Sequence, residues 1–315
     1  MDRRDFIGGG IMLGVPGAAW QVRFRNLSFV TEPVVEPPRQ GRPHAGKVLA
    51  AIQPHADDIA LFASGTVLKL RREGYRVFLI RTTNDEAKGA GDTAAEIIRN
   101  NEKDNREVGR RLGAEKTIDL GYRSRYWNDG SYVELRARLV YLFRLLKVNT
   151  VICDDPWGHY EENPDHSTTG RCVNEACLLA GDAMTFPEHF DAGLQPQAVT
   201  ERYYYARGPQ LVNWIVDISR EMDGKVNVNL ANVSLGPAGH SGSKLRRKLA
   251  AGGKRLPLLG SSDDTADRRY IKHIVLREDA ELGKKHGLEF AEPFHYIGPK
   301  ESMLESYVSE HAEDL

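Results

Sequence analysis

Short apolar runs alternate along the chain with longer segments in which apolar residues recur every three or four positions. The runs are typical of buried strands and lie at 47–54, 76–82, 117–120 and 150–154. The longer segments are typical of helices and span 65–74, 92–112, 132–146 and 165–180. Strands that alternate with helices of this length pair in parallel. We therefore predict an α/β fold with a doubly wound, mostly parallel sheet and helices on both faces.

The pattern changes toward the C-terminus. Two further apolar runs, near 202–206 and 214–218, extend the predicted sheet. Beyond Gly236 the pattern weakens into segments rich in Gly, Lys and Arg, with a helix near 266–283. This part of the chain is therefore interpreted as an elaboration of one large domain.

The first residues carry a different signal. Arg3 and Arg4 precede a short, weakly apolar, Gly-rich run, which is typical of a twin-arginine export signal and predicts a periplasmic or secreted protein. The alternative is a basic tail on a cytoplasmic protein. Four prolines follow between 33 and 43. The predicted divisions are an export signal at 1–20, a proline-rich arm or linker at 21–46, and a single domain at 47–315 with its core at 47–220 and an elaboration at 221–315.

Composition narrows the function classes. The 315 residues include 43 Lys and Arg against 44 Asp and Glu, so no global field favours nucleic acid as a partner. No segment reaches the roughly 18 consecutive apolar residues that indicate a transmembrane helix. Three cysteines are too few for a disulfide framework and are expected to pack as small apolar residues. These features leave the oligomeric state open.

Polar side chains suited to metal binding follow the first and fourth predicted strands. His55 and Asp58 come after the first strand, and His166 lies in the segment after the fourth. In a sheet of order 3-2-1-4-5 these two strands are neighbours, so the residues after them face one crevice. Two imidazoles and one carboxylate satisfy the usual catalytic zinc site, which keeps a fourth position for water. We predict Zn²⁺ at these three ligands, with another divalent metal such as Fe²⁺ as the alternative.

Asp57 is a second carboxylate in the same motif. One residue away from the ligand Asp58, it should point differently, which suits a general base beside a metal-bound water. The pattern thus predicts metal-assisted amide hydrolysis with that water as nucleophile. The alternative is that the Asp57–Asp58 pair caps the following helix.

The segment 55–70, together with Asn163-Pro164-Asp165-His166, resembles the PIG-L or LmbE-like de-N-acetylase family, whose signatures are a His-Pro-Asp-Asp box and a His-Pro-Asp-His box. The resemblance covers about 47–220. It implies a Rossmann-like fold, a divalent metal that is usually zinc, and removal of the N-acetyl group from a glucosamine-type sugar. Carried over by position, it places the metal ligands on His55, Asp58 and His166, and the base on Asp57.

The chain departs from the family pattern at three positions. Ala56 replaces the proline of the first box, and Asn163 replaces the first histidine of the second. Ser124 stands where some thiol-sugar deacetylases carry an acidic substrate contact. Arg99 falls where the family places a substrate-binding arginine, although a solvated helix face explains it equally well.

Other site residues are predicted from their nearness to the metal motifs. Asn163 and His159 are the candidates to stabilise developing negative charge, with His240 and His295 as alternatives. Trp157 and Tyr160 are candidates to stack on a sugar ring. The carboxylates expected to hold the ligand histidines in place are Asp154, Asp155 and Asp165.

The sequence therefore predicts a secreted or periplasmic zinc-dependent hydrolase that deacetylates an N-acetylglucosamine-type sugar or glycoconjugate. One alternative is a metal-dependent amidase for another amide or a thiol-sugar conjugate. Another is a catalytically inactive, metal-dependent sugar-binding protein, suggested by Asn163 and Ser124. The retained Asp57 argues against the last, because a binding site needs no base.

Overall fold

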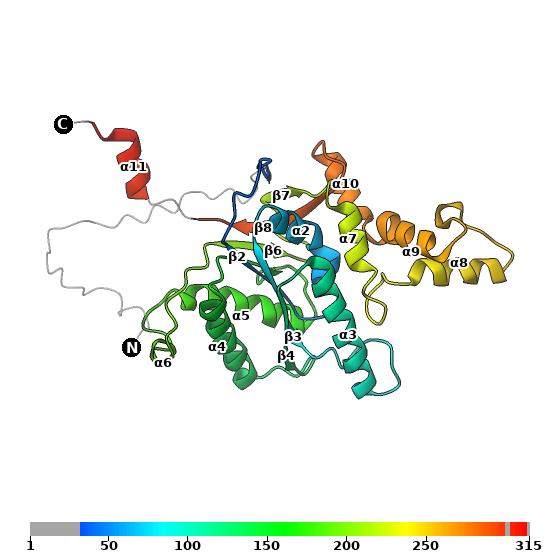
Figure 1. Ribbon diagram of the computed structural model, residues 1–315, viewed down its shortest axis with the longest axis horizontal. Helices are drawn as coiled ribbons and strands as arrows, with labels where there is room; N and C mark the ends of the chain where they lie inside the picture. Colours follow the sequence, from blue (N-terminus) through cyan, green and yellow to red (C-terminus); the bar gives the residue numbers. More distant parts are fainter. Residues whose placement is uncertain (1–31, 300–302, 314–315) are drawn as a thin grey trace, which may run out of the picture. The chain divides into compact units, whose positions relative to one another are not determined.

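The computed structural model describes residues 32–299 and 303–313 (Figure 1). The predicted export signal at 1–20 and the first part of the arm lie outside the described residues. Within them, one sheet has the strand order β1-β7-β8-β6-β5-β2-β3-β4. The strands are β1 (Val34–Val35), β2 (Val48–Gln53), β3 (Arg76–Thr83), β4 (Lys116–Tyr122), β5 (Thr150–Asp154), β6 (Glu201–Tyr205), β7 (Trp214–Asp217) and β8 (Ala291–Ile297).

The predicted strand order is confirmed. Strands β4, β3, β2, β5 and β6 are neighbours in that sequence and pair in parallel, which is the order 3-2-1-4-5 of the predicted core. The fully buried pattern of β2 and β5 fits strands covered on both faces. This arrangement places the carboxyl ends of β2 and β5 side by side.

Strand β8 corrects the sequence interpretation. Residues 291–297, for which the sequence predicted no strand, form an interior strand, antiparallel to both β6 and β7. Phe294 is fully buried between them. The strand was missed because Pro293 interrupts the run, and a proline ordinarily argues against an interior strand. The C-terminal region therefore contributes to the sheet itself.

Helices lie over both faces of the sheet. The helix predicted at 266–283 is in fact two helices joined by a π-helical turn, Ile271–Val275. The α-helices are α1 (Asp58–Phe62), α2 (Ser64–Arg72), α3 (Ala94–Leu112), α4 (Asp129–Leu146), α5 (Pro164–Ala180), α6 (Glu188–Asp191), α7 (Met222–Asn229), α8 (Ser241–Ala251), α9 (Asp263–Tyr270), α10 (Arg277–Lys285) and α11 (Met303–His311), with a short 3₁₀ turn at Pro257–Leu259. Among the described residues, no helix is long and apolar enough to cross a membrane.

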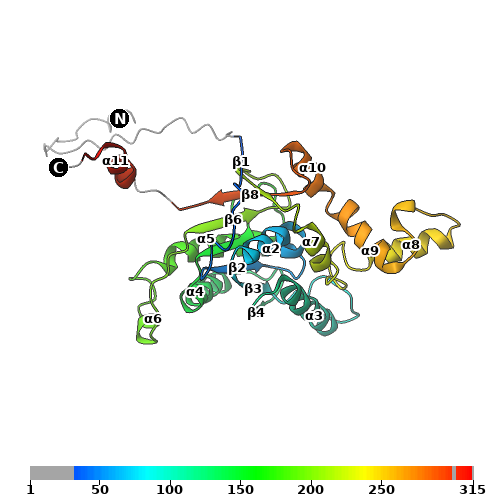
Figure 2. The ribbon, with the colours of Figure 1, turned by 45° about the horizontal axis from the view of Figure 1, so that its top comes forward.

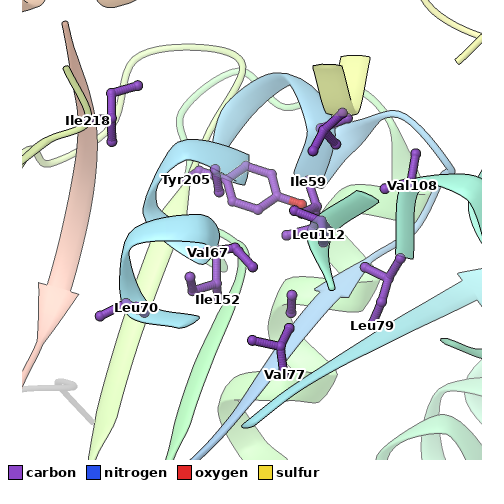
Figure 3. Packing of buried hydrophobic residues seen from close by; sticks show 14 of the residues in the cluster. Ile59, Val67, Leu70, Val77, Leu79, Val108, Leu112, Ile152, Tyr205 and Ile218 are labelled. Carbon is purple, nitrogen blue, oxygen red and sulfur yellow. The ribbon is translucent and has the colours of Figure 1, made fainter. Parts of the chain in front are cut away.

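Two apolar clusters fill the space between sheet and helices. One joins the sheet to α1, α2, α3 and α7, and Figure 3 shows Ile59, Val67 and Leu112 within it. The other lies under α4 and α5, and its members include the three cysteines. All three cysteines are free and buried, as predicted. Figure 2 shows α4 on one side of the sheet and α7 on the other, so the two faces are covered by different helices.

The start of α4 offers a test of local stability. Asn128 accepts a hydrogen bond from the Ser131 backbone N–H (2.8 Å), and the Ser131 hydroxyl oxygen accepts one from the Asn128 N–H (3.0 Å). Because loss of such a cap leaves helix N–H groups unpaired, we expect Asn128→Ala to lower the free energy of unfolding by about 1 kcal/mol in chemical denaturation. Glu134→Ala, which removes an exposed ion pair to Arg138 on the same helix, is the control, with an expected change below about 0.5 kcal/mol. Equal effects of the two variants would contradict the capping role.

Candidate metal-binding site

Three predicted ligands meet at the carboxyl ends of β2 and β5. His55 follows β2, Asp58 begins α1, and His166 lies in the first turn of α5, which follows β5. The backbones of β2 and β5 pair directly, from Leu49 opposite Thr150 onward. Adjacent parallel strands end at the same edge of the sheet. His55 and His166, 111 positions apart in sequence, therefore come into contact.

The facing atoms of the triad converge on one point. The Nδ1 atom of His55 lies 3.2 Å from an Asp58 carboxylate oxygen and 3.1 Å from Nε2 of His166. The Nε2 atom of His166 lies 3.5 Å from the other Asp58 oxygen. One ligand atom from each residue lies within 4.8 Å of the others. Two imidazole nitrogens and a carboxylate so arranged fit a divalent cation of the zinc type.

Asp165 holds the His55 ring from behind. The Nε2 atom of His55 lies 2.9 Å from Asp165 Oδ2, which leaves Nδ1 for the metal position. The other Asp165 oxygen accepts hydrogen bonds from the Arg125 backbone N–H (2.7 Å) and the Trp127 indole N–H (2.6 Å). Burial opposes ionisation of Asp165, but these hydrogen bonds outweigh it and lower its pKa. A fixed carboxylate behind a ligand histidine orients the ring and makes it a stronger donor.

Asp154 and Glu161 hold the His166 ring in the same manner. The Nδ1 atom of His166 lies 3.2 Å from an Asp154 oxygen and 3.1 Å from a Glu161 oxygen. Although burial lowers the pKa of His166, Asp58 and Asp154 outweigh that effect and raise it to about 9. The site therefore stabilises positive charge, which is the electrostatic condition for holding a cation.

Asp155 does not contact either ligand histidine. Its carboxylate instead accepts a hydrogen bond from the Trp157 backbone N–H (2.9 Å) and lies 3.3 Å from the His295 ring. Successive residues of an extended chain point to opposite sides, and Asp154, the neighbour, faces the metal position. Of the two neighbouring carboxylates predicted to support a ligand histidine, only Asp154 contacts one, and the prediction for Asp155 is wrong.

The triad lies in the wall of a cavity of about 440 Å³. Asp57 also lines the cavity, next to Gly236. Its side chain makes no helix-capping hydrogen bond, so the capping alternative is wrong for this residue. Burial, followed by the negative charge of Asp58, raises the pKa of Asp57 to about 7. A carboxylate with such a pKa can accept and return a proton near neutral pH.

Asn163 and Ser124, two of the three departures from the family pattern, also line this cavity. The Asn163 side-chain oxygen caps α5 by accepting the Asp165 backbone N–H (3.0 Å). This bond turns the amide oxygen toward the helix and leaves the amide NH₂ as the group able to donate into the cavity. Ser124 is buried and donates to the Thr83 hydroxyl (3.3 Å).

Besides Asp154 and Asp155, six predicted site residues lie outside this cavity, and two of them, His240 and His295, lie against Asp267 (3.1 Å) and Asp155 (3.3 Å) instead. Arg99 is exposed on α3, where Asn101, Asp104 and Asn105 are the buried polar residues instead. His159 is exposed, and its backbone N–H donates to the Pro209 carbonyl (2.9 Å), whereas Glu161 of the same loop contacts His166. Trp157 and Tyr160, in the same loop, are 52% and 88% exposed. Their predicted roles have no support from this geometry and stay predictions.

Several cavity residues were not predicted from the sequence. Asp85 follows β3, and its carboxylate accepts hydrogen bonds from the Ala56 N–H (3.0 Å) and the Arg81 guanidinium (2.8 Å). The sequence could have indicated Asp85, because it follows a parallel strand and the triad was predicted from residues that follow such strands. Arg125, Arg207 and residues 235–237 also line the cavity. No periodicity or spacing marks these positions, because loops carry no such pattern.

Comparisons with known proteins agree with this geometry. The family model "PIG-L: GlcNAc-PI de-N-acetylase" matches residues 50–177. A diacetylchitobiose deacetylase of Thermococcus kodakarensis is 30% identical over 186 residues, which are 57% of this chain and 67% of the relative. The chain thus covers about two thirds of that relative's length.

Solved structures show the same fold. The N,N'-diacetylchitobiose deacetylase of Pyrococcus horikoshii superposes with a TM-score of 0.61 at 23% identity, covering 80% of this chain and 84% of that one. The 4-carboxy-2-hydroxymuconate hydratase of Pseudomonas putida KT2440 superposes with a TM-score of 0.58 at 13% identity, covering 81% and 98%. Because enzymes of different reaction classes share this fold, the reaction has to be argued from the site.

Proposed function

The chain belongs to the PIG-L family of de-N-acetylases, and from this premise we propose that it is a zinc-dependent hydrolase that removes the acetyl group from an N-acetylglucosamine-type sugar. The observation that carries the proposal is the convergence of His55, Asp58 and His166 beside the separate carboxylate of Asp57, all in one cavity. The sugar class is supported by the names of the deacetylase relatives, which act on diacetylchitobiose.

The residues present fit a metal. His55 through Nδ1, His166 through Nε2 and Asp58 through its carboxylate would hold it, and zinc is the preferred ion for this donor set. When bound, such an ion polarises an amide carbonyl and lowers the pKa of water. Asp165, Asp154 and Glu161 keep the two rings in the required orientation.

Asp57 supplies the proton transfers. It takes a proton from the attacking water, whose oxygen forms the new bond to the acetyl carbon, and returns that proton to the nitrogen as the C–N bond breaks. The products are acetate and the free amine. Asn163 is preferred to His159 as the donor to the developing oxyanion, because only Asn163 lines the cavity.

The test is an acetate-release assay of metal-loaded protein with N-acetylglucosamine, its oligosaccharides and unrelated N-acetyl amides. We expect release from the sugars and little from the other amides. Release from none of them would overturn the proposed function, and release mainly from non-sugar amides would indicate a different amidase.

Gly236 gives a separate test of how Asp57 is positioned. A Cβ atom at this residue would lie 2.5 Å from Asp57 Oδ2, closer than van der Waals contact permits. We therefore expect Gly236→Ala to displace the carboxylate and lower kcat by about 10- to 100-fold, with bound metal unchanged. Steady-state kinetics and metal analysis measure both quantities.

The matched control is Gly253→Ala. Gly253 has a similar positive φ of 67°, against 83° at Gly236, but no atom lies within 4 Å of its added Cβ. The control therefore carries the same backbone strain without the contact to Asp57. A kcat for Gly236→Ala that matches the Gly253→Ala value would show that Gly236 does not position the base.

A further inference from the structure

A second cavity, of about 610 Å³, adjoins the first. Both are lined by Leu61, Phe62, Arg207 and Pro237. Leu61 and Phe62 belong to α1, whose first residue is the ligand Asp58. The second cavity therefore begins at the end of α1 opposite to the ligand Asp58. A molecule bound in the first cavity can extend into the second.

The wall of the second cavity is largely apolar. The π-helical turn contributes Val275, α10 contributes Leu282, and Leu276 lies between these two elements. The ring of Phe62 stacks on that of Tyr205, with the ring centroids 5.5 Å apart. The charge of Asp279 is balanced within the protein, because its carboxylate lies 2.7 Å from the ammonium of the fully buried Lys225. The other charged lining residues are exposed at the rim: Glu278, Glu281, Lys285 and Arg207. Apolar walls with a charged rim suit an apolar ligand group.

Val275, Leu276 and Leu282, on one side of the second cavity, belong to the part of the chain that the family model does not match. The model ends at residue 177, whereas α10 and the π-helical turn lie beyond residue 270. Figure 1 shows α10 carried by the C-terminal region, next to α7 and β8. The residues of the triad therefore lie in the matched part, and the second cavity is formed between that part, through Leu61 and Phe62, and the C-terminal elaboration.

We infer that the second cavity is a subsite for an apolar group attached to the sugar, so that the substrate is an N-acetylglucosamine-type glycoside with an apolar aglycone. The inference rests on the proposed function. The sugar and its acetyl group lie in the first cavity, and the aglycone passes Leu61 and Phe62 into the second. Burial of the aglycone adds binding free energy in proportion to its apolar area.

The experiment compares the methyl and 2-naphthyl β-glycosides of N-acetylglucosamine with the metal-loaded, full-length protein. We expect kcat/KM to be on the order of tenfold higher for the naphthyl glycoside, because burial of one aromatic ring contributes at least that factor. Leu282→Trp places a larger side chain in the second cavity, where it obstructs the aglycone, and should remove this preference. Its effect on the naphthyl glycoside should be several times larger than its effect on the methyl glycoside.

Ile274→Trp is the matched control. Ile274 neighbours Val275 in the same π-helical turn but is 41% exposed and does not line the cavity. It should keep the naphthyl preference. Thermal melting of both variants checks that each is folded. Equal kcat/KM for the two glycosides in the wild type, or equal losses on both in Leu282→Trp, would overturn the subsite.

Binding separates this inference from the proposed function. Calorimetry with the corresponding 2-amino glycosides, which carry no acetyl group, measures the subsite without catalysis. If no glycoside releases acetate, the proposed function fails, yet tighter naphthyl binding that Leu282→Trp removes still supports the subsite. If acetate is released but the two amines bind equally, the subsite alone fails.

Discussion

Asp57→Asn is expected to lower kcat for deacetylation by about 10²- to 10⁴-fold while the protein keeps its metal. The substitution preserves the shape of the side chain but removes the group that accepts the proton, and a general base contributes rate enhancements of that order. Asp57 is not one of the three converging ligands, so its loss leaves the donor set intact. Steady-state kinetics together with metal analysis by mass spectrometry measures both parts of the prediction.

The control for this variant is Asp223→Asn. Asp223 is 92% exposed and pairs only with Lys272 at the surface, so the same chemical change there should leave kcat within experimental error. A wild-type kcat in Asp57→Asn would assign the proton transfer to another group. Loss of metal from Asp57→Asn would show instead that Asp57 is a ligand.

The pH dependence follows from the same residue. A base works in its deprotonated form, so activity decreases as the pH falls through its pKa. Burial and the charge of Asp58 raise the pKa of Asp57 to about 7, whereas a cation held by Asp58 opposes that shift. We expect the acid limb of kcat/KM between about 4, the ordinary aspartate value, and about 7. This limb should be absent from the residual activity of Asp57→Asn.

His55→Ala and His166→Ala are expected to abolish metal binding and activity together. Each removes one of three protein ligands and exposes the carboxylates that supported its ring. Loss of an outer partner of a ligand histidine already costs about 10- to 100-fold in metal affinity, so loss of the ligand should cost more than about 100-fold. Metal analysis after dialysis, with activity at saturating metal, measures the effect.

His159→Ala is the matched control. His159 lies in the loop between β5 and α5, near His166 in the sequence, but it is exposed and outside the cavity. The variant should retain metal at the wild-type level. Its activity also tests the predicted catalytic role: a large loss of kcat with metal retained would restore His159 as a catalytic residue. Retention of metal in both His55→Ala and His166→Ala would show that the triad is not the metal site.

Much of the site could be predicted from sequence because its residues occupy positions with a regular structural meaning. His55 and Asp58 follow one buried apolar run, and His166 follows another. A parallel sheet makes such positions converge, since its strands all end at one edge. The same rule applied to β3 would have included Asp85. The role of Arg99, which only the family resemblance suggested, stays a prediction, because helical spacing alone does not decide which polar face of α3 is covered; the buried polar residues there are Asn101, Asp104 and Asn105.

By itself, then, the sequence determined the alternation of strands and helices, the order of the five parallel strands and the convergence of His55, Asp58 and His166 with Asp57 beside them. These depend on local periodicity and on the right-handed connections that join the parallel strands of a sheet. Only the tertiary structure decided that Asp154 rather than Asp155 faces His166, that Gly236 packs on Asp57, and that β8 and α10 complete the sheet and a second cavity. Those contacts join residues far apart in the chain, so they depend on how loops and side chains pack, which no local pattern specifies.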